Sequence, residues 1–186
     1  ATVATGKRLG TIAAPATEAD RPRLAEFFKK LVNKDPATLA WTRGFVAADQ
    51  VQRTIVAAEQ GVKLINLSFT GDLPFLTEPA LQAGAGICAW GGAIRVQMFT
   101  GRVLERYPLF YAIQQLMGHI RGGYDSIERL RPGDDQARVY RLRTGDRTLW
   151  VAWRDPRRAL LPEDGQPSLE VALKIDAPGA EVENVI

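Results

Sequence analysis

Cysteine and histidine, two residue types that often perform chemistry in proteins, are scarce in this 186-residue chain. It has a single cysteine, Cys88, and a single histidine, His119. Cys88 lies in an apolar run, which is typical of a buried, unreactive thiol, and His119 ends a segment of helical periodicity, where its charge favours a helix C-terminus. One residue of each kind is too few for a His/Cys metal cluster, and nothing in the sequence indicates that the two form a cysteine–histidine nucleophile pair. A Ser/His/Asp triad that contains His119 is formally possible, but nothing in the sequence places a serine beside this histidine.

Glycines at positions 84, 86, 91 and 92 raise the question of a phosphate-binding loop. Their spacing fits neither the dinucleotide fingerprint that follows a strand nor the Walker motif, which ends in a lysine. A flexible loop or close packing of the backbone is therefore the better interpretation. We predict no cofactor and no metal.

The charge pattern argues against a nucleic-acid partner, and the hydropathy argues against a membrane-spanning segment. The 24 Lys and Arg residues exceed the 21 Asp and Glu residues by three, and the basic residues of the second half are interleaved with acidic ones. A nucleic-acid groove would need a denser patch on one face, so a solvated surface is the better interpretation. The longest apolar run, 81–94, is too short to span a bilayer, and no signal peptide is visible at Ala1.

Two tryptophans, Trp150 and Trp153, lie three positions apart in a segment with the composition of a strand. Because successive side chains of a strand point to opposite faces, these two indoles are expected on different faces. One of them then belongs to the core. The other could be an exposed platform for a sugar or the anchor of an interface.

The elements that would position these residues are organised around Phe45–Phe69. Apolar residues recur at helical spacing as far as Gln60, and Gly61 can end the helix because it lacks a Cβ. The run Val62–Phe69 is almost continuously apolar, which is typical of a strand buried on both faces of a parallel sheet. We therefore predict one helix–strand unit here.

Other segments have clear but weaker patterns. Those before residue 123 are a strand at 8–14, N-cap residues at 17–20, a helix at 24–32, a connector at 37–44, a segment at 94–99 that is open between strand and helix, and a helix at 107–120. Those after it are strands at 127–130, 138–143, 147–153 and 169–175, with a hairpin turn at 144–146. The change in pattern predicts two domains, 1–122 and 123–186.

The order of these parts resembles the C-terminal end of clan A glycoside hydrolases. The last barrel helix of that family carries a segment similar to YPLFYAIQQL, here 107–116, and leads into a small β-domain with strands similar to YRLRTGDRTLWVAW, here 140–153. The resemblance covers residues 45–175. It implies an α/β fold in which residues 1–122 are the C-terminal portion of a TIM-barrel-like (β/α)8 fold and residues 123–186 a small antiparallel β-sandwich-like domain.

The resemblance also implies where a site would lie. Val62–Phe69 would be the eighth barrel strand, so the loop after it would border the active site, with Trp90 or Phe69 stacking on a sugar. Plain packing is the alternative for Trp90. Glu18 is the nearest match to the family's nucleophile, although it equally suits a helix N-terminus. The Asn-Glu that usually supplies the acid/base has no counterpart here.

By this resemblance the chain would be part of a glycoside hydrolase-like protein acting on O-glycosidic bonds of a saccharide, at the cell surface or outside the cell. A full barrel needs about 250 residues, so the missing strands would come from a longer precursor or a partner chain. With only one candidate carboxylate, the isolated chain is expected not to cleave aryl glycosides. The alternative is a non-catalytic structural or carbohydrate-binding subunit that assembles with other chains.

Overall fold

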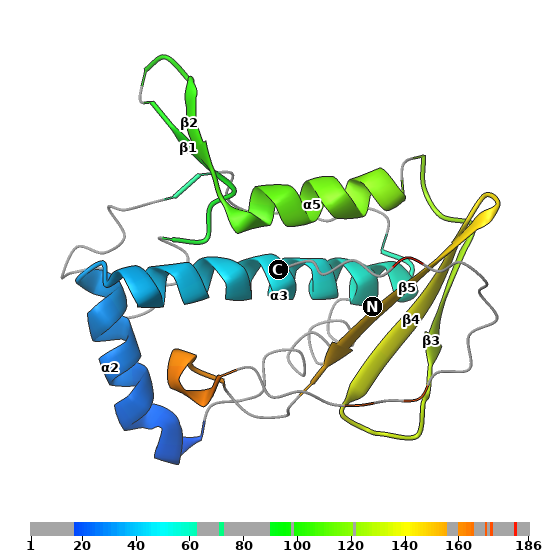
Figure 1. The fold of residues 1–186 in the computed structure, drawn as a ribbon, viewed down its shortest axis with the longest axis horizontal. Helices are drawn as coiled ribbons and strands as arrows, with labels where there is room; N and C mark the ends of the chain where they lie inside the picture. The colour runs from blue at the N-terminus through cyan, green and yellow to red at the C-terminus, as the bar shows by residue number, and fades with distance from the viewer. Residues whose placement is uncertain are drawn as a thin grey trace.

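The computed structural model describes residues 17–62, 71–72, 90–97, 99–120, 122–155 and 160–165, together with residues 170, 172 and 181. Figure 1 shows the arrangement of the elements that they form. In chain order these are η1 (Glu18–Asp20), α2 (Arg21–Val32), α3 (Pro36–Glu59), β1 (Ile94–Val96), β2 (Val103–Arg106), α5 (Pro108–His119), β3 (Ser126–Leu130), β4 (Ala137–Thr144), β5 (Arg147–Arg154) and η4 (Pro162–Asp164).

Helix α3 runs through the middle of the molecule (Figure 1). Its start is fixed by Asp35, whose carboxylate accepts hydrogen bonds from the backbone N–H of Thr38 at 2.9 Å and from its hydroxyl at 2.7 Å. Pro36 occupies the first turn, where no N–H is needed. The predicted connector at 37–44 is therefore wrong, because the Asp35-Pro36 pair that ends one helix also begins the next. Gly61, with φ +76°, follows the helix end as predicted.

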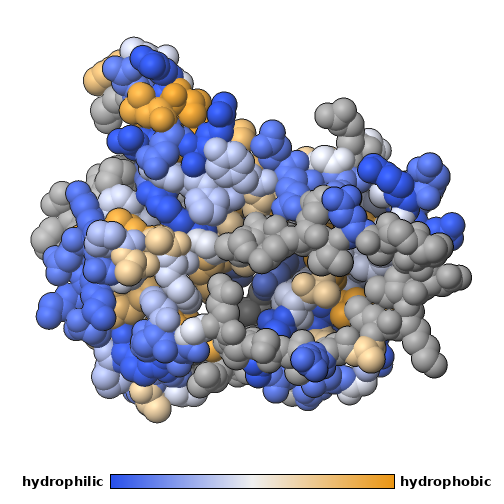
Figure 2. Space-filling model, in the orientation of Figure 1, coloured by the Kyte–Doolittle hydropathy of each residue, from blue (hydrophilic) through white to orange (hydrophobic). Residues whose placement is uncertain are grey.

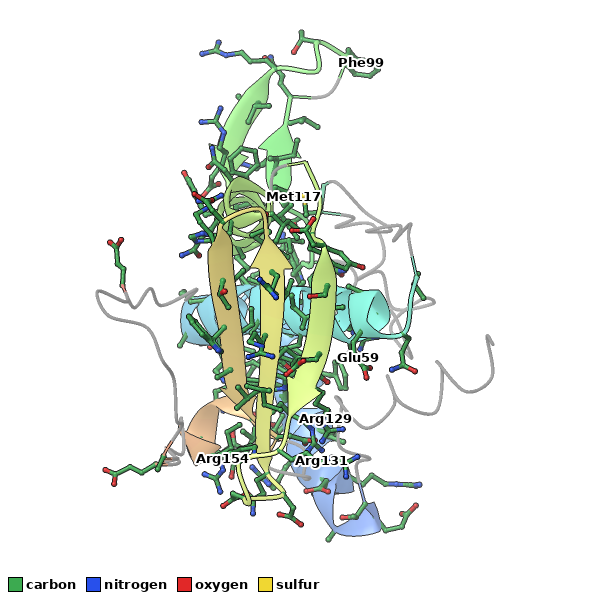
Figure 3. All side chains as sticks on the ribbon, turned by 90° about the vertical axis from the view of Figure 1, so that its right-hand side faces the viewer. Glu59, Phe99, Met117, Arg129, Arg131 and Arg154 are labelled. Carbon is green, nitrogen blue, oxygen red and sulfur yellow. The ribbon has the colours of Figure 1, made fainter. Side chains whose placement is uncertain are left out.

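Strands β3, β4 and β5 form an antiparallel sheet in that order, and helices α3 and α5 cover one of its faces (Figures 1 and 3). Alternate residues of the strands point into the space between sheet and helices. The buried residues that meet there are Ala47, Val51, Ile55, Val56, Leu109, Ala112, Leu116, Tyr140 and Leu142. This cluster is the main core of the protein.

A smaller cluster lies between α2, the N-terminal half of α3 and η4. Phe27, Leu31, Trp90 and Leu161 are its buried members. The ring of Phe27 meets the ring of Trp41 edge-on, with centroids 5.5 Å apart. Such contacts orient α2 across the end of α3, as Figure 1 shows.

The prediction that residues 1–122 form a portion of a TIM barrel is wrong. Within the described residues both sheets are antiparallel, with two and three strands, and they form no barrel. From 123 onward the described residues form one three-stranded sheet, with helices on one face, and the short η4, where a β-sandwich-like domain was expected. The physical reason is that α3 and α5 bury their apolar sides on this antiparallel sheet. Without a barrel, the structure gives no reason to expect further barrel strands from a longer precursor or a partner chain. The protein is a small α/β structure.

Several local predictions are confirmed. The hairpin at 138–153 is antiparallel, with Thr144 paired to Arg147 across its turn, and the helices at 24–32 and 107–120 are present. The strands predicted at 8–14, 62–69 and 169–175 lie almost wholly outside the described residues. The domain boundary at 122/123 stays a prediction, although residues from both sides of it share the main core.

An ion cluster joins the start of α2 to η4. The guanidinium of Arg23 lies 2.5 Å from Asp164, 3.2 Å from Glu163 and 3.6 Å from Asp20. The carboxylate of Asp20 also accepts hydrogen bonds of 2.8 Å from the backbone N–H and the hydroxyl of Thr17. These two hydrogen bonds first, and the charge of Arg23 after them, hold the pKa of Asp20 below its usual value.

A lowered carboxyl pKa stabilises the folded state above the ordinary value of 3.8, and this contribution is lost as pH falls through the folded pKa. We therefore expect Asp20→Asn to lower the denaturation midpoint at neutral pH and to lose its effect in acid, once the pH has fallen through the lowered folded-state pKa and the wild-type carboxyl is protonated as well. Urea titrations at neutral and at acid pH measure this. Glu18→Gln, on the exposed Glu18–Arg21 pair of the same turn, is the control. An equal effect of Asp20→Asn at both pH values would contradict the prediction.

Candidate functional site

The two tryptophans of β5 lie on opposite faces of the sheet, as their spacing predicts. Trp153 packs against the main core and stacks on Tyr140, with ring centroids 5.1 Å apart and planes 11° from parallel. Because side chains alternate along a strand, Trp150 belongs to the opposite, outer face. It is half-buried there. The structure thus decides which indole packs on the core and which lies on the outer face.

Trp150 forms one row across the sheet with Arg141 and Glu128. The register pairs Glu128 with Arg141 and Arg141 with Trp150. The Arg141 guanidinium lies 2.9 Å from the Glu128 carboxylate, and about half of each side chain is exposed, 44% and 52%. Cross-strand neighbours in one row lie side by side, so the indole is next to an accessible pair of donor and acceptor groups.

Exposed polar residues extend this row along the strands. Arg143 and Thr148 pair with each other one step further toward the turn on the same face, and Ser126 pairs with Arg143. Figure 3 looks onto this face, with α3 behind the strands. We call the set Ser126, Glu128, Arg141, Arg143, Thr148 and Trp150 the outer sheet face. Its members combine a flat aromatic surface with cations, a carboxylate and hydroxyls.

The local sequence holds this row in register. Gly145 takes a φ of +60° in the turn between β4 and β5, a conformation that favours glycine. Its N–H donates to the carboxylate of Asp125 at 2.8 Å, which ties the turn to the residue that precedes β3. Both neighbours of the central strand are thereby fixed at the same end of the sheet.

The residues that the resemblance singled out lie elsewhere. Glu18 is in η1, at the start of α2 and away from the sheet (Figure 1), where its side chain is 84% exposed and its carboxylate lies 2.9 Å from Arg21. Trp90 is buried in the smaller cluster beside Phe27 and Leu31, while Phe69 lies outside the described residues. Glu18 and Trp90 thus have different neighbours. Catalytic and sugar-stacking roles for these three residues stay predictions.

A buried charge cluster is the feature that the sequence analysis missed. The guanidinium of Arg43 lies 2.9 Å from the carboxylate of Asp72, with 16% and 10% of the two side chains exposed. Its central carbon is 3.2 Å from the centre of the Tyr107 ring, and Gly92 donates its N–H to Asp72 at 3.1 Å. Burial raises the pKa of the Tyr107 phenol, and the charge of Arg43 opposes that shift. Long separations in the chain hide this cluster from any local pattern.

Gly92 explains part of the glycine-rich segment. A Cβ at this position would lie 2.4 Å from the backbone nitrogen of Asp72, which is closer than real contacts allow. Close packing of the backbone, one of the two alternatives drawn from the sequence, thus accounts for this glycine. Within the part of the chain that the structure describes, no group of three or more His, Cys, Asp or Glu residues could hold a metal ion.

A shallow depression of about 500 Å³ lies where α5 leads toward β3. Its lining consists of Met117, Gly118, Ile120, Gly122, Gly123 and Tyr124. These residues offer apolar contact, with no carboxylate or cation among them. The depression therefore offers no groups for catalysis. The outer sheet face, which combines an indole with charged groups and hydroxyls, is the better candidate for a binding site.

No protein-family model, no curated protein and no solved structure matches this chain. The resemblance to clan A glycoside hydrolases therefore stays a prediction. Among the described residues, no helix combines the length and the apolar character needed to cross a membrane.

Proposed function

We propose that this protein binds a saccharide on the outer sheet face and does not cleave it. The observation that carries the proposal is the row of Glu128, Arg141 and Trp150 across β3, β4 and β5. An indole face is flat and apolar and fits the C–H side of a sugar ring. The adjacent guanidinium and carboxylate supply the donor and the acceptor that the ring hydroxyls need.

Two further properties of the site support binding. The strands hold the row on a sheet that is fixed by the main core, so little order has to be gained when a ligand binds. The Arg141–Glu128 pair remains about half exposed, so its members can exchange water for sugar hydroxyls without leaving a buried charge unpaired.

Cleavage would need a second carboxylate facing the first across the glycosidic bond. Glu128 lies beside a cation on a flat sheet, and Glu18 is exposed and paired with Arg21. Hydrolysis of O-glycosidic bonds is therefore the weaker alternative, and a binding subunit is the stronger one.

The test is a binding screen of the full chain against a panel of soluble oligosaccharides, followed by calorimetric titration of those that bind. We expect Trp150→Ala to weaken binding at least about tenfold, because a central aromatic anchor carries much of the binding energy. Tyr111→Ala is the matched control, since Tyr111 is an aromatic residue on α5 with 55% exposure. It is expected to leave affinity unchanged.

Three results would contradict the proposal: no saccharide bound by the wild-type chain, equal affinity of the wild type and Trp150→Ala, or equal losses in both variants. Aryl glycosides provide the check on cleavage. We expect no turnover. Turnover by the wild type that disappears in Glu18→Gln would show that the protein is a hydrolase and would contradict the proposal of binding without cleavage.

A further inference from the structure

The hairpin of β1 and β2 projects away from the body of the protein (Figure 1). Its apolar residues are open to solvent: Val96, Val103 and Leu104 are 45%, 43% and 47% exposed, and Phe99 is fully exposed. Figure 2 shows hydrophobic atoms gathered on this projection with hydrophilic residues around them, and Figure 3 shows Phe99 at its end. Apolar side chains at the end of a projection mark an interaction surface.

The backbone holds this tip in one shape. The N–H of Gln97 donates to the carbonyl of Arg102 at 2.8 Å, and the N–H of Gly101 donates to the carbonyl of Gln97 at 3.1 Å. Phe99 has a φ of +69°, a conformation that is strained for a bulky residue and cheap for glycine or asparagine. Strain of this kind at an exposed position points to a function for the side chain. Met98 lies outside the described residues.

The exposed apolar side chains gather at the end of the hairpin, and its two faces differ. Val96 pairs with Val103, whereas the preceding residue, Arg95, pairs with Glu105, so Leu104 has no partner in the register. Alternation places the Val96–Val103 pair and the Arg95–Glu105 pair on opposite faces. The hairpin thus carries the Val96–Val103 pair on one face and the Arg95–Glu105 ion pair on the other, with Phe99 at its end. Such an amphipathic tip can insert its apolar side chains at a membrane surface while its charged groups stay at the level of the headgroups.

The charges of the hairpin favour an anionic surface. Between Ile94 and Arg106 the sequence has three arginines, at 95, 102 and 106, and one acidic residue, Glu105, which gives a net charge of +2. Glu105 lies 3.2 Å from Arg95, and Arg106 lies over the Phe110 ring at 5.0 Å. Arg102 lies in the turn at the tip, whereas Arg95 and Arg106 lie on the strands. Cations therefore flank the apolar side chains, as the phosphate groups of a bilayer flank its apolar chains.

We propose that this hairpin docks the protein on anionic phospholipid membranes, with Phe99 entering the headgroup region and the arginines contacting phosphates. The contact is peripheral and involves no spanning segment. It is independent of saccharide binding, because the outer sheet face belongs to other strands.

The test is co-sedimentation of the full chain with vesicles of phosphatidylcholine, with and without phosphatidylserine. We expect binding to the anionic vesicles that falls with added salt and weakens at least about tenfold in Phe99→Ser. Tyr111→Ser, the matched control, removes an exposed aromatic residue from α5 and should bind like the wild type.

Each other outcome overturns the proposal. No binding of the wild type to anionic vesicles, or equal binding of the wild type and Phe99→Ser, would exclude this role of the hairpin. Oligomers of the wild-type chain that are lost in Phe99→Ser, without vesicle binding, would identify a second copy as the occupant.

Discussion

Replacing Asp72 with alanine is expected to lower the free energy of unfolding by about 3–5 kcal/mol, because it leaves a buried guanidinium without its counter-charge. The Arg43 and Asp72 side chains are only 16% and 10% exposed, and their charged groups lie 2.9 Å apart. Among the described residues, one guanidinium nitrogen of Arg43, Nη1, is already buried without a hydrogen-bond partner. After the substitution the Arg43 guanidinium would keep its contact with the Tyr107 ring and lose the contact with the carboxylate.

Urea denaturation followed by circular dichroism measures this effect. The double variant Arg43→Met/Asp72→Ala should be more stable than Asp72→Ala, since both charges are then removed together. The matched control is Asp49→Ala, which breaks the more exposed Asp49–Arg53 pair on the surface of α3 and should cost about 0.3–0.5 kcal/mol. If Asp72→Ala costs no more than Asp49→Ala, the Arg43 cluster is not buried in solution.

Leu142→Ala is expected to lower the free energy of unfolding by about 2–5 kcal/mol. Leu142 is 1% exposed in the middle strand of the sheet and belongs to the cluster that joins β4 to α3 and α5. Its neighbours across the strands, Ile127 and Leu149, pack against the same cluster. Truncation therefore opens a cavity between the sheet and the helices, where rigid elements limit how far the structure can relax.

Leu104→Ala is the matched control for this cavity. Leu104 has the same side chain on β2 but is 47% exposed, so its truncation should change stability by less than about 0.5 kcal/mol. A loss for Leu142→Ala as small as that of Leu104→Ala would contradict the packing of β4 against the two helices. A large loss with an unchanged circular dichroism spectrum would support it.

Local chemistry made the helices and the main hairpin predictable. Pro108 at the first turn of α5 and Gly61 after α3 act within a few residues of themselves, so their effect is visible in the sequence. The Thr144-Gly145-Asp146 turn likewise joins strands that are neighbours in the chain. The start of α3 was misplaced because a proline that ends one helix also suits the first turn of the next.

The hairpin of β1 and β2 was harder to predict. The sequence left 94–99 open between strand and helix, and the two strands contain only three and four residues, with apolar and charged side chains mixed. Such short strands carry too little pattern to distinguish them from a loop. Their position, projecting from the body, depends on packing around Tyr107, whose N–H donates to Ala93 at 2.9 Å.

The sequence by itself determined that Trp150 and Trp153 face opposite ways, because alternation is a property of any single strand. Only the tertiary structure decided that Trp153 enters the core and Trp150 joins the outer sheet face, since this depends on which face of the sheet α3 and α5 cover. The prediction of a TIM-barrel portion was wrong for the same reason, because the sequence does not show which elements pack against each other. An apolar helix surface in a sequence shows that a partner exists, whereas the choice of an antiparallel sheet as that partner is made by contacts between residues far apart in the chain.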